Sequence, residues 1–147
     1  MPPSDDALRA LYQEVLLDHY RRPRNRGTIA AADVSIEKKN PLCGDEVTLQ
    51  IAFDGDTVRD VKFTGQGCAI SQASASMMTQ MLAGRSRAEV RRVAARFAEM
   101  IRGDDAAAHD AMLGDLRALA GVARLPVRLK CATLAWGALA EALAEER

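Results

Sequence analysis

The stretch EVTLQIAFDGDTVRDVKF, residues 46–63, decides the fold class of this chain. In its first half apolar and polar residues alternate, which is the period of a β-strand that buries one face. The apolar residues of that half are Val47, Leu49, Ile51 and Phe53. Residues 54–56, with the sequence Asp-Gly-Asp, supply a tight turn, and a second apolar series follows before Gly65. Two strands joined by an Asp-Gly turn are typical of a β-hairpin.

The segments before the hairpin add one strand and one helix. Val34 and Ile36 alternate with polar neighbours and predict a third strand. Residues 4–20 predict an amphipathic helix with Ser4 as its N-cap, and Pro23 follows the end of that helix.

From Ala69 to the end of the chain the apolar period is helical. The predicted helices are one that stops at Gly84, one that runs from a capping box at Ser86 toward Ile101, one around residues 112–119 that ends at Gly121, and one with Pro126 in its first turn. Residues 103–105 and the three alanines after them are predicted to form a loop or a frayed connection. The sequence therefore predicts an α+β fold, a small three-stranded antiparallel sheet packed with about five helices, in a single domain over residues 1–147.

The charge balance of the chain limits the partners that it can have. Its 147 residues include 20 Lys plus Arg and 20 Asp plus Glu, so the formal net charge is zero. This balance predicts no nucleic-acid partner, because nucleic-acid binding relies on a basic surface. No apolar run reaches the length of a membrane span, and Asp5 and Asp6 replace the basic region of a signal peptide. We therefore expect no membrane partner and a cytoplasmic location.

Three cysteines lie in three different contexts, and their odd number argues against a disulfide framework. Cys43 lies between two predicted strands in the string NPLCGD, so Cys43 and Asp45 offer one soft and one hard ligand from a single turn. Cys68 lies where the last strand gives way to a helix, and a helix N-terminus favours a thiolate. Both cysteines also have structural interpretations, Cys43 as an incidental part of a turn and Cys68 as packing beneath the hairpin.

Cys131 lies inside the last predicted helix, where a lone cysteine is more often part of the core than a ligand. Its neighbours Arg128 and Lys130 favour a thiolate or an anionic partner, although they also have an ordinary interpretation as solvated charges. Spacing alone does not identify a zinc site, because the chain contains no Cys-x-x-Cys pair.

Three strings around the cysteines, NPLCGDEV, TGQGCAIS and RLKCATLAW, resemble the cysteine blocks of the SufU/IscU family of iron–sulfur cluster assembly. The opening LYQEVLLDHYRRPRNRG resembles the N-terminal helix and loop of the same family. The similarity points to the SufU branch, because IscU-type proteins carry a histidine directly before the third cysteine, where this chain has Lys130. The long segment between Gly84 and Pro126 is similar to the extra segment of SufU-type proteins.

The resemblance implies a zinc site formed by Cys43, Asp45, Cys68 and Cys131. It also implies a sulfurtransferase-type activity, in which Cys43 accepts persulfide sulfur from a SufS-like cysteine desulfurase. The sulfur would then pass toward downstream cluster scaffold proteins. Arg128 is a candidate catalytic residue on this interpretation, since its charge lies beside a ligand.

Two alternatives for the function stay open. A scaffold on which a transient [2Fe–2S] cluster is assembled and handed on would use the same ligands, because thiolate-rich sites accept both zinc and clusters. A structural zinc protein would use the metal only to hold the hairpin to the helices.

The remaining candidates have more ordinary interpretations. His19 lies on the first predicted helix and is expected to be structural or to face a partner, and His109 is expected to be exposed. Residues 21–26 include four arginines, which either dock the desulfurase or form a solvated turn. The methionines predicted to pack in the core are Met77, Met78 and Met81.

Overall fold

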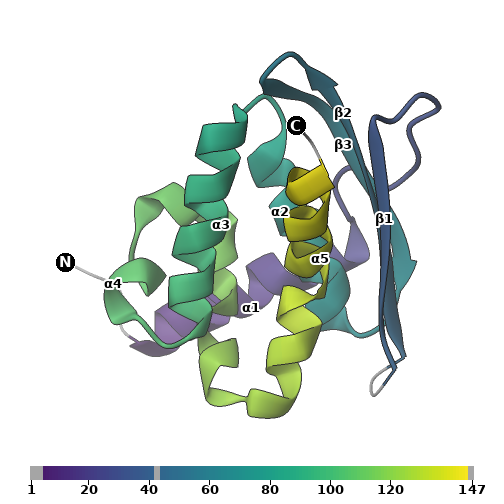
Figure 1. Cartoon of the computed structure of the whole chain (residues 1–147). Coiled ribbons are helices and arrows are strands. Elements are labelled where there is room, and N and C mark those ends of the chain that lie inside the picture. The colour runs from purple at the N-terminus through teal and green to yellow at the C-terminus, as the bar shows by residue number, and fades with distance from the viewer. Residues whose placement is uncertain (1–4, 42–43, 146–147) are drawn as a thin grey trace.

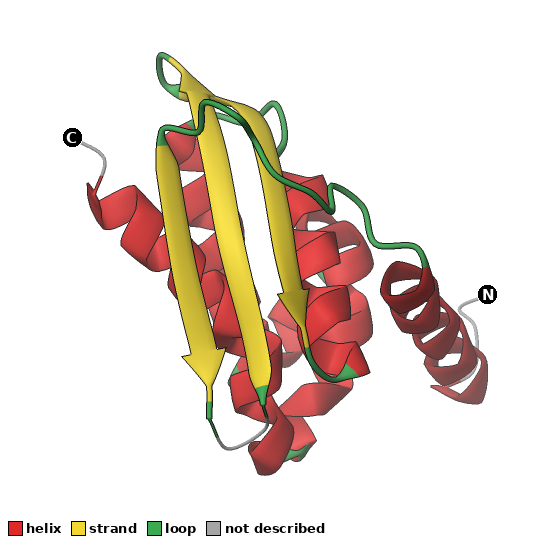
Figure 2. Ribbon diagram, turned by 90° about the vertical axis from the view of Figure 1, so that its right-hand side faces the viewer, coloured by secondary structure: helices red, strands yellow, loops and turns green. Residues whose placement is uncertain are grey.

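A three-stranded antiparallel sheet forms one layer of the protein, and the helices cover one of its faces (Figures 1 and 2). The computed structural model describes residues 5–41 and 44–145. The strands are β1 (Val34–Asn40), β2 (Asp45–Asp54) and β3 (Thr57–Gln66), in the spatial order β1-β2-β3. The central strand is therefore β2.

The hairpin of β2 and β3 turns at Gly55 and Asp56, and the φ of Gly55 is 59°. In the register of the sheet, Leu49 lies opposite Ile36 of β1 and Phe63 of β3. All three residues are buried, because their side chains point to the face that the helices cover. The hairpin and the third strand predicted from the alternating pattern are confirmed.

Six helical segments flank the sheet in the described part of the chain. They are α1 (Asp5–Arg21), α2 (Ala69–Leu82), α3 (Arg87–Ile101), α4 (Asp105–Ala108), the 3₁₀ helix η1 (Ala111–Arg124) and α5 (Pro126–Glu145). The predicted capping box is present: the hydroxyl of Ser86 accepts from the amide of Glu89, and the Glu89 carboxylate accepts from the amide of Ser86. The predicted α+β class is confirmed, while the assignment of residues 1–147 to a single domain stays a prediction.

Two details of the C-terminal half differ from the prediction. The alanine-rich segment is not a loop throughout, because the Asp104 carboxylate accepts a hydrogen bond of 3.0 Å from an amide three residues on and caps α4. The next helix does not end at Gly121 but continues to Arg124, and Val122 in that extension is buried in the core. The predicted cap Ser4 lies outside the described residues.

The helix α2 runs through the centre of the protein. It packs against α1, α5, η1 and β3, and every residue from 71 to 79 is buried. Met77 and Met78 are fully buried and Met81 packs against the same core, as predicted. A helix buried on all sides cannot shift without repacking its neighbours, so the residues at its N-terminus are held firmly.

None of the described helices is both long enough and apolar enough to cross a membrane. The cytoplasmic location expected from the sequence stays a prediction.

Candidate metal centre

At one end of the sheet, β1 and β3 finish and β2 begins (Figure 2). Asp45 at the start of β2 lies opposite Asn40, and the next residue, Glu46, lies opposite Gln66 at the end of β3. The chain then passes through Cys68 and enters α2. Antiparallel pairing therefore brings Asp45 and Cys68 together although they are 23 positions apart in the sequence.

Asp45 is a buried residue, only 1% exposed, and its two carboxylate oxygens face different groups. Oδ1 accepts a hydrogen bond from the backbone N–H of Cys68 at 2.9 Å, while Oδ2 lies 3.9 Å from Sγ of Cys68. A buried carboxylate is costly unless it is hydrogen-bonded or lies near a cation. The amide of Cys68 occupies Oδ1, so Oδ2 is the oxygen that would be available to a metal ion.

Cys68 is the N-cap of α2, as its place in the sequence predicted. Its Sγ accepts a hydrogen bond of 3.4 Å from the backbone N–H of Ser71. The partial positive charge of the helix N-terminus lies at this sulfur and favours a negatively charged ligand atom there. Cys68 is half-buried, so its sulfur is sheltered but not sealed from solvent.

Cys131 approaches the same point from α5 and is fully buried. The Sγ atoms of Cys131 and Cys68 and a carboxylate oxygen of Asp45 all lie within 4.8 Å of one another. Ligand atoms on a tetrahedral zinc ion are about 3.5–3.8 Å apart, so inward shifts of about 1 Å would complete three corners of the tetrahedron. Two thiolates and one carboxylate suit zinc, and the geometry of these residues therefore fits that metal.

Gly67 explains how the Asp45 carboxylate reaches its position. The φ of Gly67 is 148°, and a Cβ atom added there would overlap Asp45 Oδ1 and lie 2.8 Å from Ser71 Oγ. Glycine is therefore required at this position for a steric reason as well as a conformational one. The group that approaches the backbone of Gly67 most closely is the carboxylate of Asp45.

Cys43, the fourth member of the predicted ligand set, lies outside the described residues. Gly44 beside it has a φ of 69°, a left-handed conformation that glycine adopts without strain. Asp45, expected to project from the same loop as Cys43, is the first residue of β2. The structure thus brings three of the four predicted ligands together, and the ligand roles stay a proposal.

Arg128 and Lys130 are both exposed on the first turns of α5, and Cys131 directly follows Lys130. Their charges face solvent near the point where Cys131 enters the candidate metal centre. A catalytic role for Arg128 stays a prediction.

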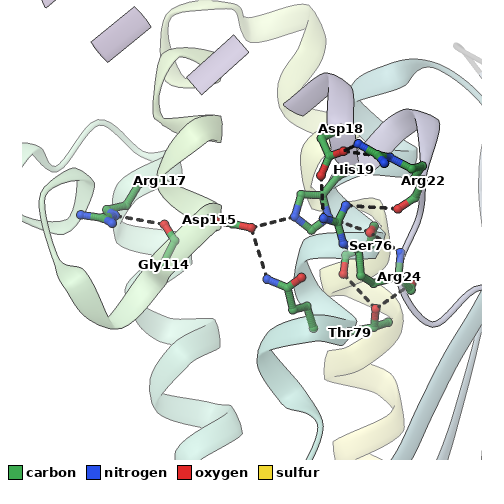
Figure 3. Close-up of polar contacts among 10 residues, drawn as sticks. Asp18, His19, Arg22, Arg24, Ser76, Thr79, Gly114, Asp115 and Arg117 are labelled. Atoms are coloured by element: carbon green, nitrogen blue, oxygen red, sulfur yellow. Dashed lines mark hydrogen bonds and ion pairs between the residues drawn. The ribbon is translucent and has the colours of Figure 1, made fainter. Parts of the chain in front are cut away.

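His19 is buried, and both of its ring nitrogens have partners (Figure 3). Nδ1 lies 2.7 Å from Oγ of Ser76 on α2, and Nε2 lies 2.9 Å from Oδ2 of Asp115 on η1. His19 therefore connects α1 to two other helices and does not face a partner. His109 is exposed as expected, and its Nδ1 lies 2.8 Å from the carbonyl oxygen of Asp105.

Two carboxylates beside His19 are stabilised in their charged form. Burial alone would raise the pKa of Asp115, but hydrogen bonds from His19 and Gln80 outweigh it and hold the pKa below its usual value. Asp18 accepts hydrogen bonds from Arg24 and from Arg22, which lower its pKa (Figure 3). These two arginines of the segment 21–26 are thus tied to α1, and a docking role for that segment stays a prediction.

The sequence did not reveal two serines of α2 that support the candidate metal centre. The backbone amide of Ser71 donates to Cys68 Sγ, and Ser74 forms two hydrogen bonds to α5. The only signal for them is the serine-rich start of the helix, which by itself indicates no function.

Comparison with known proteins gives consistent results. Residues 11–132 match the family described as the NifU-like N-terminal domain. The chain is 44% identical over 140 residues to the zinc-dependent sulfurtransferase SufU of Bacillus subtilis, with 95% of this chain and 93% of the relative covered. It is 43% identical over 136 residues to the iron–sulfur cluster assembly scaffold protein IscU of Streptococcus pyogenes, with 92% and 84% covered.

The fold is also similar to that of a solved structure. A crystal structure of a candidate iron–sulfur cluster assembly scaffold protein for the SUF system, from Fervidobacterium islandicum, superposes with a TM-score of 0.82 at 38% identity. The similarity covers 91% of this chain and 97% of the other. The three-stranded sheet with its covering helices is therefore a shared architecture.

Proposed function

The chain belongs to the family of the NifU-like N-terminal domain, and we propose that within this family it is a zinc-dependent sulfur-transfer protein of iron–sulfur cluster assembly. The observation that carries this proposal is the convergence of Asp45, Cys68 and Cys131 from β2, α2 and α5 within 4.8 Å. The name of the Bacillus subtilis relative, which includes both zinc dependence and sulfur transfer, supports it.

In this proposal Asp45, Cys68 and Cys131 hold the zinc ion together with Cys43. Bound zinc keeps the thiolates deprotonated and shields them from unwanted oxidation. The protein's own residues fix the site: the amide of Cys68 orients the Asp45 carboxylate, and the amide of Ser71 orients the Cys68 sulfur. Since Cys131 is buried and Cys68 begins a buried helix, neither is suited to leave the site.

Cys43 is the proposed acceptor of sulfur, because its sequence position falls between the last residue of β1 and the first residue of β2, in a connection of the kind that often carries function. Its thiolate attacks the terminal sulfur of a persulfide on a cysteine desulfurase. A new sulfur–sulfur bond forms on Cys43 as the bond within the desulfurase persulfide breaks, and the desulfurase cysteine leaves as a thiolate. The exchange needs no external oxidant, because the transferred sulfur carries its oxidation state with it.

The N-terminal end of α5 supports docking of such a partner. Val127 is 78% exposed and Leu125 is 51% exposed, next to the exposed cations Arg128 and Lys130. An apolar patch bordered by positive charge near the candidate metal centre suits a protein partner that delivers an anionic persulfide. On this view Arg128 stabilises the negative charge during transfer.

Metal and sulfide analysis followed by a transfer assay tests the proposal. Protein purified without oxygen should contain one zinc ion per chain and no acid-labile sulfide, and it should stimulate its cognate desulfurase. Cys43→Ala should abolish transfer of labelled sulfur, and Arg128→Ala should slow transfer with little effect on the free energy of unfolding. Arg91→Ala, which removes an exposed charge from α3, is the matched control and should leave transfer unchanged. If Cys43→Ala still accepted labelled sulfur as well as the wild-type chain does, Cys43 would not be the sulfur acceptor.

The second candidate function is a scaffold for a [2Fe–2S] cluster. The observation that favours it is the 43% identity to a relative named as a cluster assembly scaffold. Thiolate-rich sites accept both zinc and clusters, so the donor set of Asp45, Cys68 and Cys131 does not separate the two. Equal amounts of iron and acid-labile sulfide, with little zinc and no stimulation of the desulfurase, would establish the scaffold instead.

A further inference from the structure

Ser74 links the two helices that carry the cysteines of the candidate metal centre. It lies on α2, six residues after Cys68, and is 1% exposed. Its hydroxyl donates a hydrogen bond of 2.6 Å to the backbone carbonyl oxygen of Ala132 on α5. Ala132 directly follows Cys131, so the hydroxyl of one ligand helix binds the backbone of the other beside its ligand.

A second hydrogen bond determines the direction of the first. The indole Nε1 of Trp136 donates to the Ser74 hydroxyl oxygen at 3.1 Å. A hydroxyl has a single hydrogen to donate, and with Trp136 occupying a lone pair that hydrogen is directed to Ala132. The ring of Trp136 in turn stacks on Phe97 of α3, with 4.3 Å between ring centroids and 14° between planes. The segment between the second and third cysteines therefore supports this arrangement through α3.

The hydrogen bond from Ser74 to Ala132 opposes sliding of α2 and α5 along the helix axis, a movement that apolar packing resists only weakly. The two residues that flank Ser74 in the sequence, Ala73 and Ala75, are buried alanines, and so are Ala132 and Ala135 of α5. Helices that meet through such small side chains have shallow ridges, which resist sliding along the helix axis less than bulky residues do. A slide of one residue would displace a sulfur by about 1.5 Å, which is more than zinc coordination tolerates. A directed hydrogen bond between buried groups opposes such a slide.

We infer that Ser74 is a positioning residue of the metal centre: its hydroxyl, directed by Trp136, holds α2 and α5 in the register that brings the sulfurs of Cys68 and Cys131 together. This inference rests on the proposed function, since it assumes that these sulfurs bind zinc. Ser74 touches neither the metal nor the transferred sulfur, and it acts through the two helices.

The test compares zinc affinities of the full-length chain, measured by competition with a chelator of known affinity. Ser74→Ala removes the link between the helices. Thr133→Ala is the matched control, because Thr133 also lies on α5, two residues after Cys131 in the sequence, but donates its hydroxyl within that helix, to the carbonyl oxygen of Leu129 at 2.8 Å. Urea unfolding of the metal-free variants measures how far each substitution lowers stability by itself.

We expect Ser74→Ala to weaken zinc binding by about tenfold or more, in the range seen for residues that support metal ligands, while Thr133→Ala changes it by less than about threefold. Trp136→Phe keeps a ring for stacking on Phe97 but removes the Nε1–H that donates to the Ser74 hydroxyl. This variant tests the same inference if Ser74→Ala does not fold. It should weaken zinc binding by about threefold or more. If the wild-type chain binds zinc and the variants bind it equally well, the role of Ser74 is overturned while the proposed function stands. A wild-type chain that binds no zinc would overturn the proposed function and the role of Ser74 with it.

Discussion

Replacing Gly67 by alanine should damage the candidate metal centre through a single methyl group. The added Cβ would overlap Oδ1 of Asp45 and lie 2.9 Å from its Cγ and 2.8 Å from Ser71 Oγ. Carbon atoms in contact are ordinarily about 3.5–4.0 Å apart, so the Asp45 carboxylate must retreat by about 0.6–1.1 Å. That shift stretches the 2.9 Å hydrogen bond from the Cys68 amide and turns Oδ2 away from its sulfur.

The size of the effect follows from the interactions lost. A hydrogen bond to a charged group contributes about 1.5–3 kcal/mol, and a strained backbone conformation at a residue other than glycine costs about 1–3 kcal/mol. We therefore expect Gly67→Ala to lower the free energy of unfolding by about 3–5 kcal/mol in the metal-free protein. Zinc affinity should fall by about 10–100-fold, because the residue that orients a ligand is displaced.

Gly84→Ala is the control that separates the effect of backbone strain from the effect of displacing the Asp45 carboxylate. Gly84 has a positive φ of 81° and no heavy atom within 4 Å of its added Cβ, so this variant suffers backbone strain alone. It should lose about 1–2 kcal/mol of stability and keep its zinc affinity. Urea unfolding and chelator competition measure the two quantities. If Gly67→Ala bound zinc as tightly as Gly84→Ala, the contact between Gly67 and Asp45 would not control the metal centre.

Three further predictions concern stability. His19→Ala should lower the free energy of unfolding by about 2–4 kcal/mol, because it empties a buried site and leaves Ser76 and Asp115 without their shared partner; urea unfolding measures this, and an unchanged zinc content would show that His19 is not a ligand. Stability should fall as the pH drops below about 4, because the pKa values of Asp18, Asp110 and Asp115 are lowered in the folded chain. The contribution of these carboxylates to stability is complete above the unfolded pKa of 3.8 and is lost as the pH falls through the folded pKa values. Thermal unfolding of the metal-free protein across pH 2–6 measures this, and a stability that does not change over that range would contradict it. Removal of zinc by a chelator should lower the melting temperature while leaving a cooperative unfolding transition, because the apolar core extends far beyond the metal centre; a chain that unfolds when zinc is removed would instead be a structural zinc protein.

Local features of the fold were predictable from the sequence because their causes are local. The alternation in residues 46–63 determines which side of the hairpin is buried, and the turn residues between its halves determine where it folds back. The same holds for the capping box at Ser86 and for Cys68 at the start of α2, since each depends on residues within one helical turn. Around residues 105–108, where a loop or a frayed connection was predicted, the Asp104 carboxylate caps a short helix.

The candidate metal centre was predictable only in part. The resemblance to a family indicated which residues to consider, but spacing in the sequence gave no reason for Asp45, Cys68 and Cys131 to converge. Their convergence depends on the pairing of β2 with β3 and on the packing of α5 against α2, contacts between residues far apart in the chain. Periodicity reports the environment of one segment at a time, so it carries no information about such contacts.

The sequence by itself determined the strands, most of the helices, the buried face of each strand, and the residue types able to bind a metal. Only the tertiary structure decided that Gly67 admits the Asp45 carboxylate, that His19 is enclosed between Ser76 and Asp115, and that Ser74 joins α2 to α5. The physical reason is the same in each case. A hydrogen bond or a steric contact depends on distances of a few tenths of an ångström between atoms of different elements, and those distances exist only once the helices and strands have packed together.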